Sequence, residues 1–387
     1  MTLTLLAPAL VSSGCSTSGP KSSASSITLV DLQKLADAVR SRTGAPGLAV
    51  AVVRSAGAPV IAVAGVRDVS ATMAVEPADV FEIGSLTKSM TATALARLVD
   101  DGRLTWDRRI GDVFSGTPMR DEYRSATVAM LLRHRTGLSP MQSVDPEMER
   151  ELDELKGTAT EQRASLVRWL LQRPPAFAPG TAYAYSNGDY VTAGAIGEKV
   201  SGLAFDALLA REVFEPLHMA SARVGGERRS DEVRGHVMVD GRLQPVPIHD
   251  NPYDLPPAFE PAGAVRSSIG DLIGYAQNHL RALRGLAGVL TAAAAAELHR
   301  PEPGPTQVVE PFGKPVGYAG GWLELTFPNH HRVSWHNGSA GSFFAWLTIA
   351  PDDDVAIAVL TNVGGRDPGE RACRETTAGV LERLAVK

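Results

Sequence analysis

The sequence predicts a mixed α/β protein, with an antiparallel sheet flanked by helices and an inserted, mainly helical region. Three observations support this prediction: β-rich runs lie near the start of the chain, more lie near its end, and helical patterns dominate between them. With 387 residues the chain can bury a substantial core. Its hydrophobic content of 44% and charged content of 21% are ordinary for a globular protein.

Near the start, one helix and two strands are predicted. Apolar residues recur on one helical face from Leu32 to Val39, and Gly44 is placed to end that helix. Two β-rich runs follow at 48–53 and 60–66. The Ser-Ala-Gly segment between them favours a hairpin.

Four more strands and a closing helix are predicted near the end of the chain. The β-rich runs are Trp322–Phe327, Arg332–His336, Phe343–Ile349 and Val355–Leu360. Turn residues stand at 329–330 and 351–354, and the apolar residues of the closing helix are Val380, Leu381 and Leu384. The two ends together are sufficient for one sheet with helices packed on it. We therefore expect 27–80 and 262–387 to form an α/β domain.

The middle of the chain, 81–261, is expected to be a mainly helical domain. Helical patterns run over Ser85–Val99, Val128–Leu132, Ala164–Leu171 and Tyr190–Val200. A cleft between the two regions would be the natural binding site. The segment 141–157 contains the run MERELDEL, which predicts either a helical lid beside the cleft or a solvated surface helix.

The first 26 residues have the character of a leader followed by a tether. Leu3–Val11 is apolar but too short to span a bilayer, and Cys15 follows small residues in a pattern that resembles a bacterial lipobox. Residues 16–26 are polar and should not pack. This pattern predicts an exported protein, periplasmic or anchored by lipid at Cys15; a frayed tail is the alternative. The net charge of -5 gives no reason to expect a nucleic-acid partner.

Ser85 and Lys88 are the first candidates for catalysis. Residues three apart share a helix face, so the Ser hydroxyl and the Lys amine can meet. A desolvated Lys can take the proton of a Ser nucleophile, and Gly84 would let a substrate approach the backbone. The spacing alone is weak, because Ser18 and Lys21 repeat it in the tether. An N-cap Ser followed by an exposed Lys is the structural alternative.

A second motif is Tyr185-Ser186-Asn187, in a loop just ahead of a predicted helix. A neighbouring Lys can depress the pKa of a Tyr, so Tyr185 is expected to shuttle protons. The amide of Asn187 offers a donor and an acceptor to a substrate or to Lys88. By itself the motif could equally be a turn Asn beside a packed Tyr.

The third motif is His336-Asn337-Gly338-Ser339, at the end of a predicted strand. Gly338 would permit close approach of the backbone to a ligand. The N–H of Ser339 could stabilise an oxyanion together with that of Ser85. By itself His336 would more often be a structural His.

Together the three motifs resemble the serine β-lactamase and penicillin-binding-protein superfamily. Tyr185-Ser186-Asn187 is similar to the class C branch, as are the segments at 131–138, 214–219 and 261–272. The resemblance covers the chain from about Ile27 onward. It implies a β-lactamase/transpeptidase-like fold, acylation of Ser85, base and acid roles shared by Lys88 and Tyr185, and a substrate positioned by Asn187. No metal or organic cofactor is expected.

The third motif departs from the Lys-Thr-Gly that is usual in β-lactamases of this branch. A neutral His336 would anchor a substrate carboxylate less well than a Lys. We therefore expect a hydrolase of a carboxylic ester or small amide, with weak β-lactamase activity at most. A D-Ala-D-Ala carboxypeptidase or D-amino-acid peptidase is one alternative. A non-catalytic penicillin-binding-type module is another.

Overall fold

The computed structural model describes residues 27–139, 141, 146–249, 251–302, 307–309, 314–326 and 332–384. An antiparallel sheet of eight strands has the order β2-β1-β13-β12-β11-β10-β9-β8. Its strands are β1 (Gly47–Val53), β2 (Val60–Gly65), β8 (Gln307–Val309), β9 (Lys314–Tyr318), β10 (Leu323–Thr326), β11 (Arg332–Ser339), β12 (Phe344–Ala350) and β13 (Val355–Thr361). Because β1 pairs with β13, the two ends of the chain form one sheet, as predicted.

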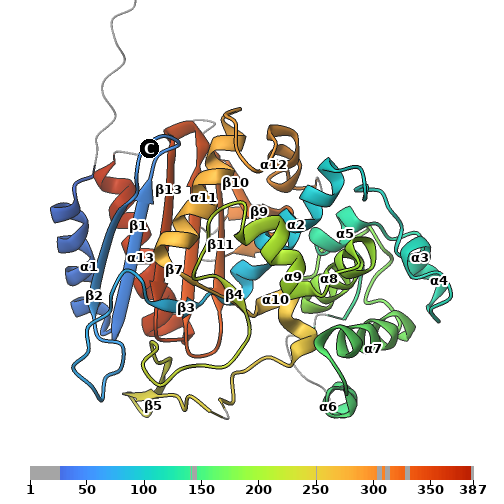
Figure 1. Ribbon diagram of the computed structural model, residues 1–387, viewed down its shortest axis with the longest axis horizontal. Coiled ribbons are helices and arrows are strands. Elements are labelled where there is room, and N and C mark those ends of the chain that lie inside the picture. Colours follow the sequence, from blue (N-terminus) through green and yellow to red (C-terminus); the bar gives the residue numbers. More distant parts are fainter. Residues whose placement is uncertain are drawn as a thin grey trace, which may run out of the picture.

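Helices cover both faces of this sheet (Figure 1). α1 (Leu29–Thr43) and α13 (Arg371–Arg383) share one face, and α11 (Ile269–Leu283) lies on the other. Side chains alternate accordingly along β1: Leu48, Val50 and Val52 belong to the core under α1 and α13, whereas the residues between them belong to the core under α11.

The remaining helices gather on the other side of the molecule (Figure 1). They are α2 (Thr87–Asp100), α3 (Ile110–Val113), α4 (Asp121–Arg124), α5 (Val128–Leu132), α6 (Pro146–Glu154), α7 (Ala159–Gln172), α8 (Asn187–Ser201), α9 (Phe205–Leu209), α10 (Glu260–Gly263) and α12 (Ala292–Leu298). α2 is buried on almost all sides, and it contacts both α8 and α10. These three elements carry most of the candidate site.

The predicted helices and strands are confirmed, with shifts of a few residues at their ends. The middle of the chain is less purely helical than the sequence suggests. β3 (Val80–Glu82), β7 (Val265–Ser268) and β4 (Arg223–Val224) form a second sheet, and β5 (His236–Val239) pairs with β6 (Arg242–Pro245). These strands have two to four residues each, which is too few to show the alternating apolar pattern that predicts strands.

Several predictions fall outside the described residues. These are the leader and tether of 1–26 with Cys15, the turn at 329–330, and part of the segment 141–157. The MERELDEL run is a helix, α6, and its Met148 is buried in the core. Within the described part of the chain, no helix has the length and apolar character needed to cross a membrane.

Candidate active site

Ser85 and Lys88 lie at the junction between a short 3-10 turn, Gly84–Leu86, and α2. Lys88 is completely buried, whereas Ser85 is half-buried. The Nζ atom of Lys88 lies 3.1 Å from the Oγ atom of Ser85. The structural alternative of an exposed Lys is therefore excluded by the burial of Lys88.

The neighbours of Lys88 are uncharged acceptors and aromatic rings. Its Nζ lies 2.8 Å from Asn187 Oδ1, 2.7 Å from the carbonyl oxygen of Ala262, and 4.9 Å from the centre of the Tyr185 ring. Burial lowers the pKa of Lys88 to about 7. A neutral amine has two N–H groups, which suit the two carbonyl oxygens, and one lone pair, which is then left for the Ser85 hydroxyl. The geometry thus fits a Lys that accepts the proton of Ser85.

Asn187 begins α8 and faces inward. Its Oδ1 accepts from Lys88, and its Nδ2 donates to the carbonyl oxygen of Met141 at 3.3 Å. Its amide therefore orients Lys88.

Tyr185 stands over the same pair of residues. Its phenol is hydrogen-bonded with Ser85, and burial raises the pKa of Tyr185 above its usual value. The expected depression of this pKa is wrong, because Lys88 is itself close to neutral and burial disfavours a phenolate. Tyr185 is therefore a protonated phenol, which can pass a proton on but does not supply the negative charge of a base.

His336 lies inside the protein within β11, and it is 2% exposed. Its Nδ1 donates to the Asn337 carbonyl oxygen, so its Nε2 accepts from the Tyr318 hydroxyl at 3.0 Å. Burial lowers the pKa of His336 to about 3. The third motif therefore holds no cation at pH 7, and both nitrogens of His336 have partners within the protein.

The glycines of the first and third motifs serve the packing of protein on protein. A Cβ at Gly84, which has φ +51°, would collide with the backbone of Ser339. A Cβ at Gly338 would collide with the carbonyl oxygen of Ile83 and lie 3.0 Å from the backbone N of Ser85. At each glycine we expected a ligand to approach the backbone closely. In the structure, another backbone segment of the protein occupies that position instead. This packing places the backbone of Ser339 against Gly84 and that of Gly338 next to the backbone N of Ser85.

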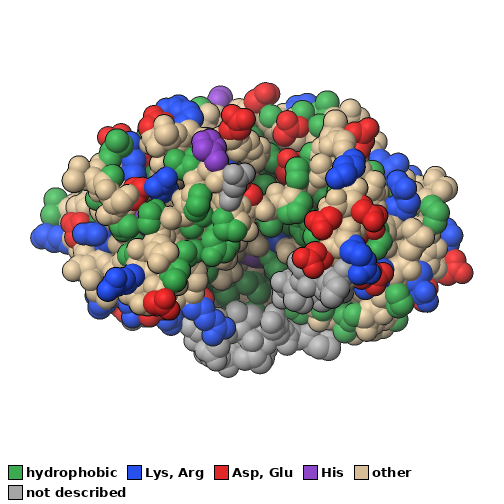
Figure 2. Space-filling model, turned by 90° about the horizontal axis from the view of Figure 1, so that it is seen from below, with side chains coloured by type: hydrophobic (Ala, Val, Ile, Leu, Met, Phe, Trp, Pro, Cys, Tyr) green, Lys and Arg blue, Asp and Glu red, His purple; other side chains and the backbone are tan. Residues whose placement is uncertain are grey.

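A cleft opens beside these residues. It has a volume of about 270 Å³, and Ser339, Gly341, Gly263 and Glu260 are among the residues that line it. Figure 2 shows a face of the molecule that is hollowed near its middle, with hydrophobic side chains along the hollow. No group of three or more His, Cys, Asp or Glu side chains is placed to hold a metal ion in the described residues.

The comparison with protein families agrees with this geometry. The model of the family described as Beta-lactamase matches residues 32–382, which is most of the chain. The chain belongs to the β-lactamase family. This confirms the resemblance that the three motifs predicted.

Individual relatives of this β-lactamase-family chain are distant but cover most of its length. Penicillin-binding protein 4 of Amycolatopsis lactamdurans is 28% identical over 344 residues, which are 86% of this chain and 84% of that protein. The octameric penicillin-binding protein homologue from Pyrococcus abyssi aligns over 92% of this chain and 78% of its own, with a TM-score of 0.74 and 23% identity. A D-stereospecific amidohydrolase from Streptomyces aligns over 91% and 98%, with a TM-score of 0.67 and 21% identity. Both solved structures therefore have the same fold as this chain.

The structure adds residues that the sequence motifs missed. Ala262 acts through its backbone carbonyl, and such a role leaves no trace in residue type. His134 lies against Tyr185, with 4.4 Å between the ring centres. It belongs to the segment 131–138 that supported the family resemblance, and this was the only signal for it.

His134 and Asp189 form a buried pair behind Lys88. The Nδ1 of His134 accepts from the backbone N–H of Ser186 at 3.2 Å, and it lies 3.0 Å from Asp189 Oδ2. Burial raises the pKa of Asp189 well above its usual value and lowers that of His134. Asp189 acts on Lys88 as well: it raises the pKa of Lys88 and so opposes part of the effect of burial.

Proposed function

We propose that this β-lactamase-family protein is a serine hydrolase that forms an acyl-enzyme on Ser85 and hydrolyses a carboxylic ester or small amide. One observation supports this above all: Lys88 is buried among neutral acceptors, 3.1 Å from Ser85 Oγ. In such surroundings a Lys can act as a base near pH 7.

In the first half of the reaction, Ser85 Oγ attacks the substrate carbonyl carbon while its proton moves to Lys88 Nζ. The N–H groups of Ser85 and Ser339 would stabilise the oxyanion. When the bond to the leaving group breaks, the leaving group takes a proton from Lys88 through Tyr185. The product is an acyl-enzyme on Ser85.

In the second half, water attacks the acyl-enzyme and gives its proton to the same Tyr185–Lys88 pair. The carboxylic acid is released and Ser85 recovers its proton. No step needs a cofactor. Asn187 contributes by orienting Lys88, and His336 contributes by holding Tyr318 next to the site.

The neutral third motif favours an ester or small amide over a β-lactam. A β-lactam carries a carboxylate, and His336 offers no cation to it because burial lowers its pKa to about 3. The His336→Lys variant tests this point. We expect it to raise the rate on carboxylate-bearing cephalosporins relative to simple esters, and an unchanged ratio would contradict our interpretation.

A small substrate panel tests the function itself. Wild type and Ser85→Ala would be assayed with p-nitrophenyl acetate and butyrate, a chromogenic cephalosporin and a D-Ala-D-Ala peptide. We expect ester turnover by wild type that the variant lacks. If no substrate turns over, and a fluorophosphonate labels wild type no better than the variant, the protein is not a serine hydrolase.

A D-Ala-D-Ala peptidase is the second candidate. The observation in its favour is the 28% identity to a protein described as penicillin-binding protein 4. Turnover of the peptide but not of the esters would favour this candidate. Stable labelling by a fluorescent penicillin without turnover would favour a penicillin-binding module.

A further inference from the structure

The cleft next to Ser339 has a wall with four charged side chains: Glu82, Asp254, Glu260 and Arg266. Two of the carboxylates are neutralised. Arg228 forms ion pairs with Glu82 and Asp254, and Arg266 Nη2 lies 3.3 Å from Glu82. Two cations thus balance two anions, and Glu260 is the carboxylate that is left.

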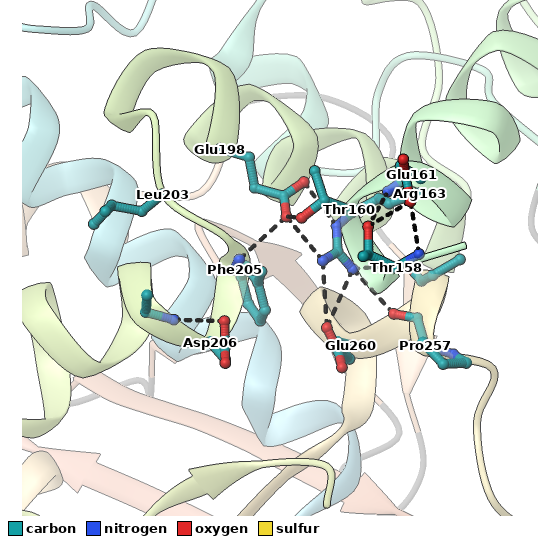
Figure 3. Close-up of polar contacts among 12 residues, drawn as sticks. Thr158, Thr160, Glu161, Arg163, Glu198, Leu203, Phe205, Asp206, Pro257 and Glu260 are labelled. Carbon is teal, nitrogen blue, oxygen red and sulfur yellow. Dashed lines mark hydrogen bonds and ion pairs between the residues drawn. The ribbon is translucent and has the colours of Figure 1, made fainter. Parts of the chain in front are cut away.

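Glu260 shares its own cation with a second carboxylate (Figure 3). The completely buried Arg163 binds Glu198 through two hydrogen bonds of 3.0 and 3.1 Å. Its distances to Glu260 Oε2 are longer, 3.3 and 3.5 Å. One guanidinium therefore faces two carboxylates, and the surplus negative charge lies on Glu260, toward the cleft.

The second oxygen of Glu260 is available to a ligand. No described residue donates a hydrogen bond to Oε1, and the side chain is 18% exposed. Gly225 also lines the cleft here, and even a Cβ at that position would lie 3.7 Å from Oε1. The absence of a side chain at Gly225 thus leaves room in front of this oxygen.

The electrostatic surroundings of Glu260 favour a cation as its partner. The pKa of Glu260 is raised to about 7, chiefly by burial; Arg163 lowers it, and the carboxylates of Asp206 and Glu198 raise it. An ammonium group arriving in the cleft would stabilise the charged carboxylate, as any nearby opposite charge does. An ammonium group of the substrate would thus form an ion pair with Glu260 through Oε1.

Glu260 is also close to the reacting groups. It is the first residue of α10, and Ala262 of the same short helix accepts from Lys88 at 2.7 Å. The cleft that Glu260 lines extends to Ser339, whose backbone lies against Gly84, the residue before Ser85. A substrate acylating Ser85 would therefore have its nearby substituents within reach of Glu260.

We propose that Glu260 selects substrates that carry a primary ammonium group, such as an ester or amide of an amino acid with a free amine. This inference rests on the proposed hydrolase function and names its substrate class. Glu260 forms an ion pair with the ammonium through Oε1, and Arg163 holds Oε2 in place. A neutral substrate of the same shape lacks this interaction.

The test compares alanine p-nitrobenzyl ester with its N-acetyl derivative, each as the D and the L enantiomer. We expect kcat/KM of wild type to favour the free amine at least tenfold, for the preferred enantiomer. Glu260→Gln should lower this ratio at least tenfold, mainly by raising KM for the free amine. It should change kcat/KM for the acetylated ester less than twofold.

Asp206→Asn is the matched control, because Asp206 is an exposed carboxylate close to Glu260 that does not line the cleft. This variant should keep the amine preference within twofold. An equal loss on both esters in Glu260→Gln, or no amine preference in wild type, would overturn the proposal. If wild type also turns over no substrate of the panel described above, and fluorophosphonate labels it no better than Ser85→Ala, the hydrolase function on which the proposal rests is overturned instead.

Discussion

Lys88 and Arg163 are both basic side chains with no exposed surface, and both lie among the helices, but their neighbours differ. Lys88 meets the amide oxygen of Asn187, the carbonyl of Ala262 and a serine hydroxyl. Arg163 meets the carboxylates of Glu198 and Glu260. Among the described residues no carboxylate forms an ion pair with Lys88, and Asp189 acts on it only at longer range, whereas two carboxylates form ion pairs with Arg163.

This difference separates a reactive base from a structural cation. A buried ammonium without a counter-ion is destabilised, and a Lys can respond by losing its proton. A guanidinium does not lose its proton in proteins, so a buried Arg needs carboxylates. Arg163 therefore ties α7, α8 and α10 together, and two of these elements, α8 and α10, supply the acceptors of Lys88.

Replacing Lys88 by Met should have the largest effect. The variant removes the base, and we expect acylation to fall about 10³-fold, which corresponds to about 4 kcal/mol. Fluorophosphonate labelling rates would measure it. Labelling within tenfold of wild type would contradict the role of Lys88.

The same variant should be more stable than wild type at pH 7. The pKa of Lys88 is about 7 in the folded protein and 10.5 for an unperturbed Lys, so the unfolded chain binds the extra proton between these values. Wild-type stability should therefore rise with pH from about 7 to 10.5. We expect a gain of about 1–3 kcal/mol for Lys88→Met, because the lost hydrogen bonds offset part of the relief. A variant less stable than wild type would contradict a depressed pKa.

Replacing Arg163 by Met should have the next largest effect. It should lower the stability of the protein, whereas Lys88→Met should raise it. The buried Glu198 would lose the guanidinium that balances its charge. We expect the free energy of unfolding, measured with urea, to fall by about 3–5 kcal/mol. The double variant Arg163→Met/Glu198→Gln should recover part of the loss. If the free energy of unfolding of Arg163→Met falls by less than about 1 kcal/mol, Arg163 does not act as a structural cation, and the contrast with Lys88 fails.

Replacing Asn187 by Asp should make Lys88 resemble Arg163. A carboxylate 2.8 Å from Nζ would favour the ammonium form and raise the pKa of Lys88. We expect the acid limb of kcat/KM against pH to move up by about one unit or more, which is about 1.4 kcal/mol. Asn187→Ala removes the acceptor without adding charge and should not move this limb upward. If kcat/KM depends on pH in the same way in Asn187→Asp and in wild type, the neutral acceptors around Lys88 do not explain its low pKa.

Among the ion pairs compared, the exposed pair of Arg42 and Glu375 should contribute least to stability. Their closest atoms are 2.6 Å apart, but Arg42 is 58% exposed. Because water screens such a pair, Arg42→Ala should cost less than about 1 kcal/mol by urea unfolding. A loss as large as that of Arg163→Met would mean that burial does not decide the value of these contacts.

The sequence was sufficient for the sheet, the main helices and the three motifs. The long, almost continuously apolar runs of β1, β12 and β13 and the helical pattern of α2 are strong local signals. The short strands β3, β4 and β7 have no such pattern, because their pairing depends on distant segments. The assignment of residue ranges to two domains stays a prediction.

Within the site, Ser85, Lys88, Tyr185 and Asn187 were found from their spacing and come together in the structure. Sequence reasoning reversed the direction of the Tyr185 pKa, because burial is a property of the packed chain and not of the motif. For the same reason Ala262 and the His134–Asp189 pair were missed. A backbone carbonyl and a buried pair of side chains act through their place in the folded protein, which the residue types alone do not reveal.

The central claim is that Lys88 is neutral near physiological pH, and the labelling rate as a function of pH tests it most directly. The rate of fluorophosphonate reaction with Ser85 would be measured from pH 5 to 10 in wild type. Because the neutral amine is the base, we predict a rate that rises with pH and reaches half of its plateau near pH 7. A rate that is flat over this range, or a midpoint above pH 9, would contradict the account.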